Sequence, residues 1–369
     1  MILTIGAVVL LLVIIYLVFV NFYPSFGGDV SKERKQTYIS SKQFEDGKFL
    51  NKNPEIPEDM SFSKMLSISR KFFFEKVENG RPDQDLNVQY IDSMEIVDYS
   101  KETRLIWFGH SAFLLQMEGK TILIDPMFGS VPAPHQWMGE KRFNKRLPIA
   151  IEKLPKIDAV IISHDHYDHL DYESINKLKD KVGDFFVPLG VGVHLEAWKV
   201  DPSKIQEMDW WEETTFKGID LACTPAQHFS GRKFSNGQST LWSSWVIKTD
   251  ATALYFSGDS GYAHHFKEIG ERYGPFDFAM MECGQYNTMW PDIHMFPEET
   301  AQAGVDIKAK AIMPIHWGAF KLALHSWTDP IERVTRKAQE LKLPLVTPKI
   351  GEPILISDLP NPQSTWWTD

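Results

Sequence analysis

The sequence predicts an α/β fold in which two β-sheets pack face to face between layers of helices, preceded by one membrane-spanning helix. Three observations support this prediction. The chain begins with an uncharged apolar run, short strand-like runs are interspersed with helical stretches from about residue 103, and polar side chains follow several of those strands directly. Because 43% of the 369 residues are hydrophobic, the chain can fill a large core.

The net charge and the cysteine count narrow the classes of function. The net charge is −10, and no basic stretch is longer than the mixed residues 141–146, so a nucleic-acid partner is not expected. The two cysteines, Cys223 and Cys283, do not make a disulfide framework and favour a reducing compartment. We expect both thiols to be inert core residues.

Residues 1–25 are predicted to form a transmembrane anchor. No charged residue occurs between positions 2 and 23, and a helix of that length spans about the 30 Å of a bilayer's hydrocarbon core. A cleaved signal peptide is the competing interpretation, but it would need a positive N-terminal region and a small-residue cleavage site, which the sequence lacks. The basic residues Lys32, Arg34 and Lys35 follow, and they predict a single-pass protein whose main domain lies on the cytoplasmic side.

Residues 26–100 are polar and irregular, and we interpret them as a linker and docking segment. Within them, residues 67–76 could form an amphipathic helix against the membrane or against the domain, and we expect the domain. The main domain is assigned to residues 101–369. Its strands are expected at residues 104–108, 112–117, 121–124, 159–162, 185–189, 219–224, 241–248, 253–256, 278–281 and 311–315. Its helices are expected at residues 171–181, 193–199, 297–307 and 330–341.

The most informative stretch is residues 161–171, where an apolar run ends in three histidines and three aspartates. It lies between an expected strand and an expected helix, so it forms a loop at the carboxyl end of a strand. His164 and His166 are two residues apart and can point the same way, whereas Asp168 and His169 follow on the turn and face a second point. This arrangement predicts two metal ions. A solvated polar loop is the alternative, but such loops use Lys, Glu and Asp far more freely than His.

Three further candidate ligands lie at or just past the ends of other expected strands. They are His228, Asp259 and His316. Ligands at the same edge of several strands converge in space even though they are far apart in the sequence. Asp125 ends the strand at residues 121–124, where it could accept the N–H of a ligand histidine or cap the turn before Pro126.

These residues carry a family resemblance. The H-x-H-x-D-H run from His164 to His169, with the later His228, Asp259 and His316, resembles the metallo-β-lactamase superfamily, whose fold is a four-layer αββα sandwich. Five other segments resemble the branch of phospholipases D that hydrolyse N-acylphosphatidylethanolamine, together with its bacterial relatives. They are WFGHS at 107–111, IDP at 124–126, TPAQH at 224–228, GDSGY at 258–262 and IHWG at 315–318, and the resemblance runs from about Thr103 to Ala323.

The resemblance implies a ligand set and an activity. It assigns His164, His166 and His228 to one zinc ion and Asp168, His169 and His316 to the other, with Asp259 bridging them. His294 matches a histidine that the family places near the substrate phosphate, and we take Asp168 and His294 as the candidate catalytic residues. The expected reaction is hydrolysis of an N-acylated phosphatidylethanolamine, or a similar phospholipid, to phosphatidate and an N-acylethanolamine.

Four other histidines are not expected to bind metal, and two alternative functions stay open. His110 is expected to support a ligand or the fold, and His264, His265 and His325 are expected at the surface or the pocket rim. A lactonase of the ascorbate-6-phosphate lactonase type is the first alternative, and a non-catalytic, membrane-tethered metal-binding module is the second. Sites of this kind also hold iron or manganese. The sequence does not determine the oligomeric state.

Overall fold

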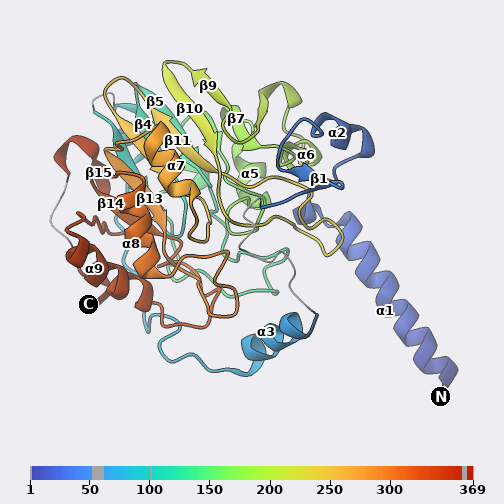
Figure 1. The fold of residues 1–369 in the computed structure, drawn as a ribbon. Helices are drawn as coiled ribbons and strands as arrows, with labels where there is room; N and C mark the ends of the chain where they lie inside the picture. The colour runs from blue at the N-terminus through green and yellow to red at the C-terminus, as the bar shows by residue number, and fades with distance from the viewer. Residues whose placement is uncertain (1, 52–61, 100–101, 360–363, 369) are drawn as a thin grey trace.

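The structure is a computed structural model, and it describes residues 2–51, 62–99, 102–359 and 364–368. Two sheets pack against each other, and helices cover their outer faces (Figure 1). The seven-stranded sheet has the order β15-β3-β4-β5-β6-β7-β8 and the six-stranded sheet the order β14-β13-β12-β11-β10-β9. The predicted four-layer αββα sandwich is confirmed.

Each sheet contains an antiparallel and a parallel part. The first sheet consists of β3 (Arg104–Trp107), β4 (Phe113–Met117), β5 (Lys120–Ile124), β6 (Ile157–Ile161), β7 (Val182–Pro188), β8 (Ile205–Met208) and β15 (Pro353–Leu355). The second consists of β9 (Glu213–Phe216), β10 (Ile219–Thr224), β11 (Ser244–Lys248), β12 (Ala253–Phe256), β13 (Phe278–Glu282) and β14 (Ile312–Ile315). Strands β5 to β8 are parallel, as are β12 to β14, so the carboxyl ends of neighbouring strands meet at one edge of each sheet.

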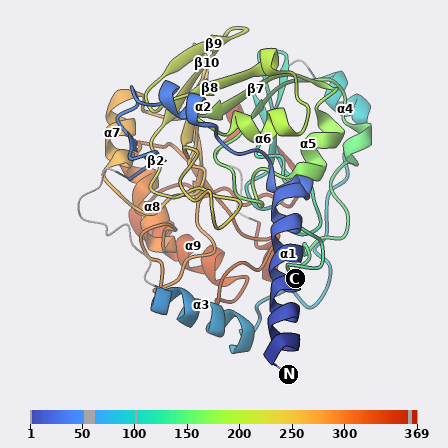
Figure 2. The same cartoon turned by 90° about the vertical axis from the view of Figure 1, so that its right-hand side faces the viewer.

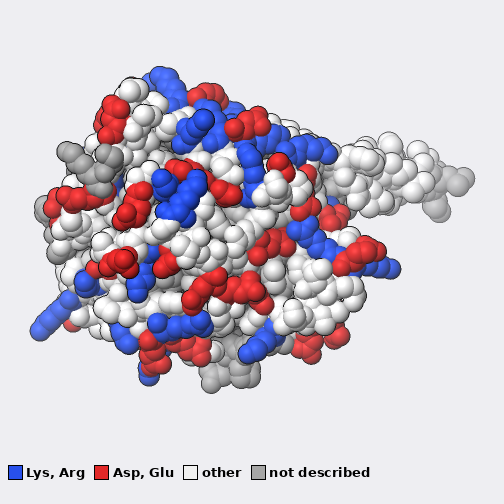
Figure 3. All heavy atoms as spheres, turned by 90° about the horizontal axis from the view of Figure 1, so that it is seen from above, with Lys and Arg blue, Asp and Glu red and all other residues white. Residues whose placement is uncertain are grey.

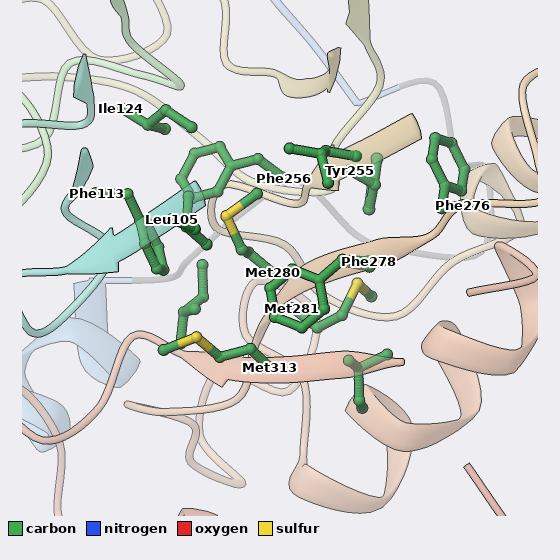
Figure 4. Close-up of a cluster of buried hydrophobic side chains, with 14 of the residues drawn as sticks. Leu105, Phe113, Ile124, Tyr255, Phe256, Phe276, Phe278, Met280, Met281 and Met313 are labelled. Atoms are coloured by element: carbon green, nitrogen blue, oxygen red, sulfur yellow. The ribbon is translucent and has the colours of Figure 1, made fainter. Parts of the chain in front are cut away.

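The core forms because side chains alternate between the two faces of each strand. Leu105 and Trp107 of β3 lie in the core between the sheets, whereas Ile106 of the same strand packs into the outer cluster. Figure 4 shows the inner layer, where Phe113 of the first sheet approaches Phe256 of the second, with ring centroids 6.4 Å apart. All of these residues are fully buried, which fixes the two sheets relative to each other.

Helices cover both sheets, and they leave the strand ends free to carry polar loops. Helices α5 (Tyr172–Leu178) and α6 (Gly192–Ala197) contribute apolar residues to the outer cluster of the first sheet. Helices α7 (His265–Arg272), α8 (Pro297–Asp306) and α9 (Asp329–Leu341) contribute theirs to the core of the second. The edge strands β8 and β9 and helix α7 were not predicted, because the edge strands are mostly polar and α7 buries only one side of a short polar sequence.

The N-terminal segment begins with α1 (Ile2–Phe22), whose side chains are almost all exposed. In the described part of the chain, it is the one helix long and apolar enough to cross a membrane. Figure 3 shows it as a protrusion without charged residues, whereas acidic and basic side chains are interspersed over the domain surface beside it. After it come α2 (Lys32–Thr37), β1 (Phe44–Glu45), β2 (Lys48–Phe49), α3 (Phe62–Phe74) and α4 (Ser93–Val97).

The junction that follows α1 is packed onto the domain. The buried Arg232 side chain donates hydrogen bonds to the carbonyl oxygens of Ser25, Asp165 and Leu170. Trp198 donates its indole N–H to the carbonyl of Pro24 at 2.7 Å. Asp165 and Leu170 belong to the histidine-rich loop after β6, so Arg232 ties the end of α1 to that loop.

Candidate metal centre

The side chains that the sequence singled out converge at the carboxyl ends of strands. The loop after β6 carries His164, His166, Asp168 and His169, while the other three candidate ligands follow β10, β12 and β14. Trp245 of β11 donates its indole N–H to the carbonyl of Ile162 at 3.0 Å, so the second sheet supports the loop of the first.

Three histidines form the first group of candidate ligands. His166 Nδ1 lies 3.0 Å from His164 Nε2 and 3.2 Å from His228 Nε2. His228 Nδ1 lies 2.9 Å from the carbonyl oxygen of Ile293. Because a carbonyl can only accept, Nδ1 carries the proton and Nε2 keeps a lone pair directed at the other two rings.

The second group combines a carboxylate with two histidines. Asp168 Oδ2 lies 3.1 Å from His316 Nε2 and 3.5 Å from His169 Nε2. On its outer side, His169 Nδ1 contacts the buried carboxylate of Asp125 at 2.7 Å. Asp125 also accepts from the Ser163 N–H at 2.7 Å, so its orientation is fixed by the backbone. The contact predicted between Asp125 and a candidate ligand histidine is therefore present in the structure.

Asp259 lies between the two groups. Its Oδ2 is 3.1 Å from His316 Nε2 and 3.8 Å from both His164 Nε2 and His228 Nε2. Its Oδ1 is 3.1 Å from His169 Nε2, yet both of these buried atoms lack a hydrogen-bond partner. Buried polar atoms that face one another without a hydrogen bond are the arrangement expected of ligands for a common cation. The donor set therefore fits metal ions.

The charges of the site are consistent with metal binding. Burial lowers the pKa of His228 to about 3 and lowers that of His164 well below its ordinary value, so both rings are neutral, as ligands must be. Burial also opposes protonation of His316, but Asp259 and Asp168 outweigh it and raise its pKa to about 10. In the absence of a cation, protons on such rings offset the buried carboxylates, so metal binding and proton release are coupled.

His294 lies beside these groups, at the wall of a cavity of about 270 Å³. Its ring stacks on that of His316 with centroids 5.1 Å apart, and its Nδ1 lies 3.3 Å from Glu282 Oε1. Most of the candidate ligands that line the cavity are buried and form its base, whereas its apolar lining residues are partly or largely exposed and form its mouth. The mouth is formed by Ile68, Phe72, Phe229, Trp290, Ile293 and Leu322.

Sequence reasoning missed one contact of this site, that of Glu282. Glu282 ends β13 and is fully buried beside His294 and His316, and burial raises its pKa to about 8. Like Asp259, Glu282 is a polar residue at the end of an apolar strand. It was missed because the strand was expected to end at Met281 and Glu282 was not considered. His110, expected to support a ligand or the fold, has its Nε2 2.8 Å from Asp168 Oδ2.

Three residues of the candidate metal centre also have a strained backbone. His110, Asp125 and His316 have φ angles of 56°, 39° and 65°, which L-residues rarely adopt and which cluster at functional sites.

One expectation about another histidine was wrong. His265 was expected at the surface or the pocket rim, but it is buried against Phe266 and Ser260, because α7 had not been predicted. The tryptophans divide between core and surface: Trp242 and Trp245 are fully buried, Trp290 lines the cavity, and Trp137 is exposed.

Comparison with known proteins agrees with this geometry. Residues 120–317 match the family model described as a beta-lactamase superfamily domain, and the chain belongs to the metallo-β-lactamase superfamily. It is a metal-dependent hydrolase of that superfamily. Over 267 residues it is 40% identical to an uncharacterized protein of Mycobacterium tuberculosis, which covers 71% of this chain and 70% of that one.

Two further similarities concern a phospholipase and a solved structure. The chain is 30% identical over 274 residues to N-acyl-phosphatidylethanolamine-hydrolyzing phospholipase D 1 of Caenorhabditis elegans, covering 69% of this chain and 77% of that one. The structure of Igni18, a metallo hydrolase from the archaeon Ignicoccus hospitalis, aligns with a TM-score of 0.52 and 23% identity, over 69% of this chain and 98% of that one. The second similarity concerns the fold alone.

The contact between Asp125 and His169 generates a test of the second ligand group. Asp125→Asn removes the charge that orients His169, and losing such a partner typically weakens metal affinity about 10- to 100-fold. Competition with a chromogenic chelator measures the affinity of each metal ion. Asp158→Asn, which changes an aspartate of β6 at the opposite end of the strand, is the matched control and should leave both affinities unchanged. Equal affinities in wild type and Asp125→Asn would contradict the assignment.

Proposed function

We propose that the protein is a membrane-anchored dinuclear zinc phosphodiesterase of the phospholipase D type. Its substrate is N-acylphosphatidylethanolamine or a similar phospholipid, and its products are phosphatidate and an N-acylethanolamine. The observation that carries the proposal is the placement of Asp259 between two groups of metal-binding side chains at the base of a cavity with an apolar mouth. The similarity to the nematode phospholipase supports the choice of substrate.

The seven candidate ligands divide between two zinc ions, with Asp259 shared. The first ion is assigned to His164, His166 and His228, and the second to Asp168, His169 and His316. When bound, two such ions supply a nucleophile near neutral pH and offset the negative charge of a phosphodiester. Iron or manganese would fit the same nitrogen and oxygen donors.

The side chains of the cavity position the lipid and its leaving group. An apolar mouth accommodates acyl chains, while the polar base receives the phosphodiester. His294 borders both parts, and its ring N–H can donate to the leaving oxygen as charge develops there. Glu282 Oε1 lies 3.3 Å from His294 Nδ1, although neither of these buried atoms has a hydrogen-bond partner. Asp168 faces the same cavity, and its carboxylate is oriented by His110 and His316.

The membrane is the second partner in this proposal. Helix α1 anchors the chain as a single span, and the basic residues Lys32, Arg34 and Lys35 that follow favour a cytoplasmic domain. The substrate is then reached from the bilayer rather than from solution. No nucleic-acid partner is proposed, because acidic and basic side chains are interspersed on the domain face in Figure 3.

Turnover of three substrates tests the proposal. The full chain in mixed micelles should release an N-acylethanolamine from N-acylphosphatidylethanolamine, and it should cleave a water-soluble bis-aryl phosphodiester through the same site. A sugar lactone phosphate serves as the third substrate. Opening of the lactone without cleavage of either diester would contradict the phospholipase and favour the lactonase.

Replacement of His294 separates leaving-group assistance from metal binding. His294→Gln should lower kcat for the lipid by about 10²- to 10⁴-fold, the range typical of a lost proton donor. A nitrophenyl diester should be cleaved at nearly the wild-type rate, because nitrophenolate leaves without a proton. His264→Gln is the matched control, since that side chain is largely exposed and is not among the residues that line the cavity. An equal loss on both substrates would contradict the role.

A further inference from the structure

Helix α3 has two faces with different surroundings. Ile68 and Phe72 are spaced i and i+4, so they share one face, and both line the mouth of the metal cavity. Phe72 stacks on Trp290, with ring centroids 5.9 Å apart and planes inclined by 16°. This face of α3 therefore packs on the domain, as we expected from the sequence. The expectation did not concern the other face.

The opposite face of α3 is apolar and basic, and it is exposed. Leu66, Arg70 and Phe74 share this face, because each follows the previous one by four residues. Leu66 is 61% exposed and Phe74 is 81% exposed. The sequence of the helix contains three basic residues and no acidic residue. A face with exposed apolar and basic residues is typical of a helix that lies on an anionic lipid surface.

The packed junction after α1 fixes which side of the domain would meet a bilayer. Arg232 and Trp198 hold the backbone at Ser25 and Pro24, immediately after the end of α1. Gly27 (φ +70°) lies so close to His194 that a Cβ atom there would stand 2.2 Å from His194 Nδ1, so the chain is closely packed at this point as well. The direction of α1 is therefore set by the domain.

Helix α3 lies on the side of the domain toward which α1 extends. Both views show α3 at the lower end of the molecule, with α1 running past its level (Figures 1 and 2). An exposed tryptophan also lies near the end of α1. Ring contacts lead from Tyr23 to His135 at 5.4 Å and from His135 to Trp137 at 5.7 Å, and Trp137 is 74% exposed. An exposed aromatic residue near the end of a membrane-spanning helix is typical of a membrane interface.

We propose that α3 docks on the anionic surface of the bilayer that α1 spans and forms the membrane-facing wall of the metal cavity. The proposal rests on the membrane anchor of the proposed function, and it adds a second lipid contact at the cavity mouth. A lipid surface is the occupant because α3 lies on the side of the domain toward which the apolar helix α1 extends. Lipid would then pass from the bilayer to the metal centre beside α3.

A fluorescent label measures the depth of α3 directly. Cys223 and Cys283 are fully buried, so a maleimide dye attaches selectively to a cysteine introduced by Phe74→Cys. The full chain is reconstituted in phosphatidylcholine vesicles with or without phosphatidylglycerol, and quenchers are placed at known depths on the lipid chains. The dye should be quenched by shallow quenchers, more strongly with phosphatidylglycerol, and less strongly at high salt.

The same dye at Glu271→Cys on α7 is the matched control, because α7 lies away from α3 and α1 in Figure 1. It should remain accessible to an aqueous quencher in every vesicle. An equally water-accessible dye at position 74 would overturn the proposal. Shielding that rises with protein concentration and ignores the lipid quenchers would assign the face to a second copy of the chain, and would also overturn it.

Cleavage of vesicle lipid by variants of α3 tests whether docking of this helix helps lipid to reach the metal cavity. Leu66→Glu combined with Phe74→Glu places charges on the outer face only, and it should lower cleavage of vesicle lipid by roughly tenfold or more. Cleavage of the soluble diester should be unchanged. Met94→Glu combined with Val97→Glu is the matched control on α4, where both side chains are similarly exposed, and it should retain full vesicle turnover.

The two proposals fail in different ways. A wild-type chain that cleaves the soluble diester but no lipid would overturn the phospholipase assignment, and the dye would still report whether α3 docks. Wild-type vesicle turnover in the α3 double variant, together with a water-exposed dye, would overturn the docking of α3 and leave the phospholipase intact.

Discussion

The buried carboxylate of Asp259 is the constraint on which the rest of the site depends. A carboxylate shielded from water is costly unless positive charge lies against it, and Asp168 and Asp125 are held at the same sheet edge. Five histidines surround these groups, and none of them is a permanent cation. Bound metal would supply the missing charge, and this requirement accounts for rings from separate strands being held 3 to 4 Å from one carboxylate.

Only a rigid scaffold can hold that arrangement, and the two packed sheets provide it. The ligands come from the ends of four strands in two sheets, so any sliding of one sheet over the other would separate them. The fully buried aromatic and methionine side chains between the sheets prevent such sliding. Hydrogen bonds across the interface, such as that from Trp245 to Ile162, tie the second sheet to the ligand loop of the first. Arg232 extends the same support to the end of α1.

The sequence predicted most of what depends on local pattern. Apolar runs located the inner strands, and polar residues at their ends located all seven candidate ligands, because strand ends at one edge meet in space. Glu282 obeys the same rule and was missed because the apolar run ends one residue before it. The polar edge strands β8 and β9 were missed because their neighbours in the sheet, rather than their composition, make them strands. The contact of Arg232 with Ser25 joins residues 207 apart, and no local pattern reports it.

The central claim is that Asp259 organises two metal ions in one site. Counting metal by mass spectrometry after equilibrium dialysis, on the wild-type chain and on Asp259→Asn, tests it most directly. We expect two ions per wild-type chain and the loss of both, or a large fall in both affinities, in the variant, because the shared ligand supports each. A wild-type chain that binds a single ion, or a variant that retains two with unchanged affinity, would contradict it.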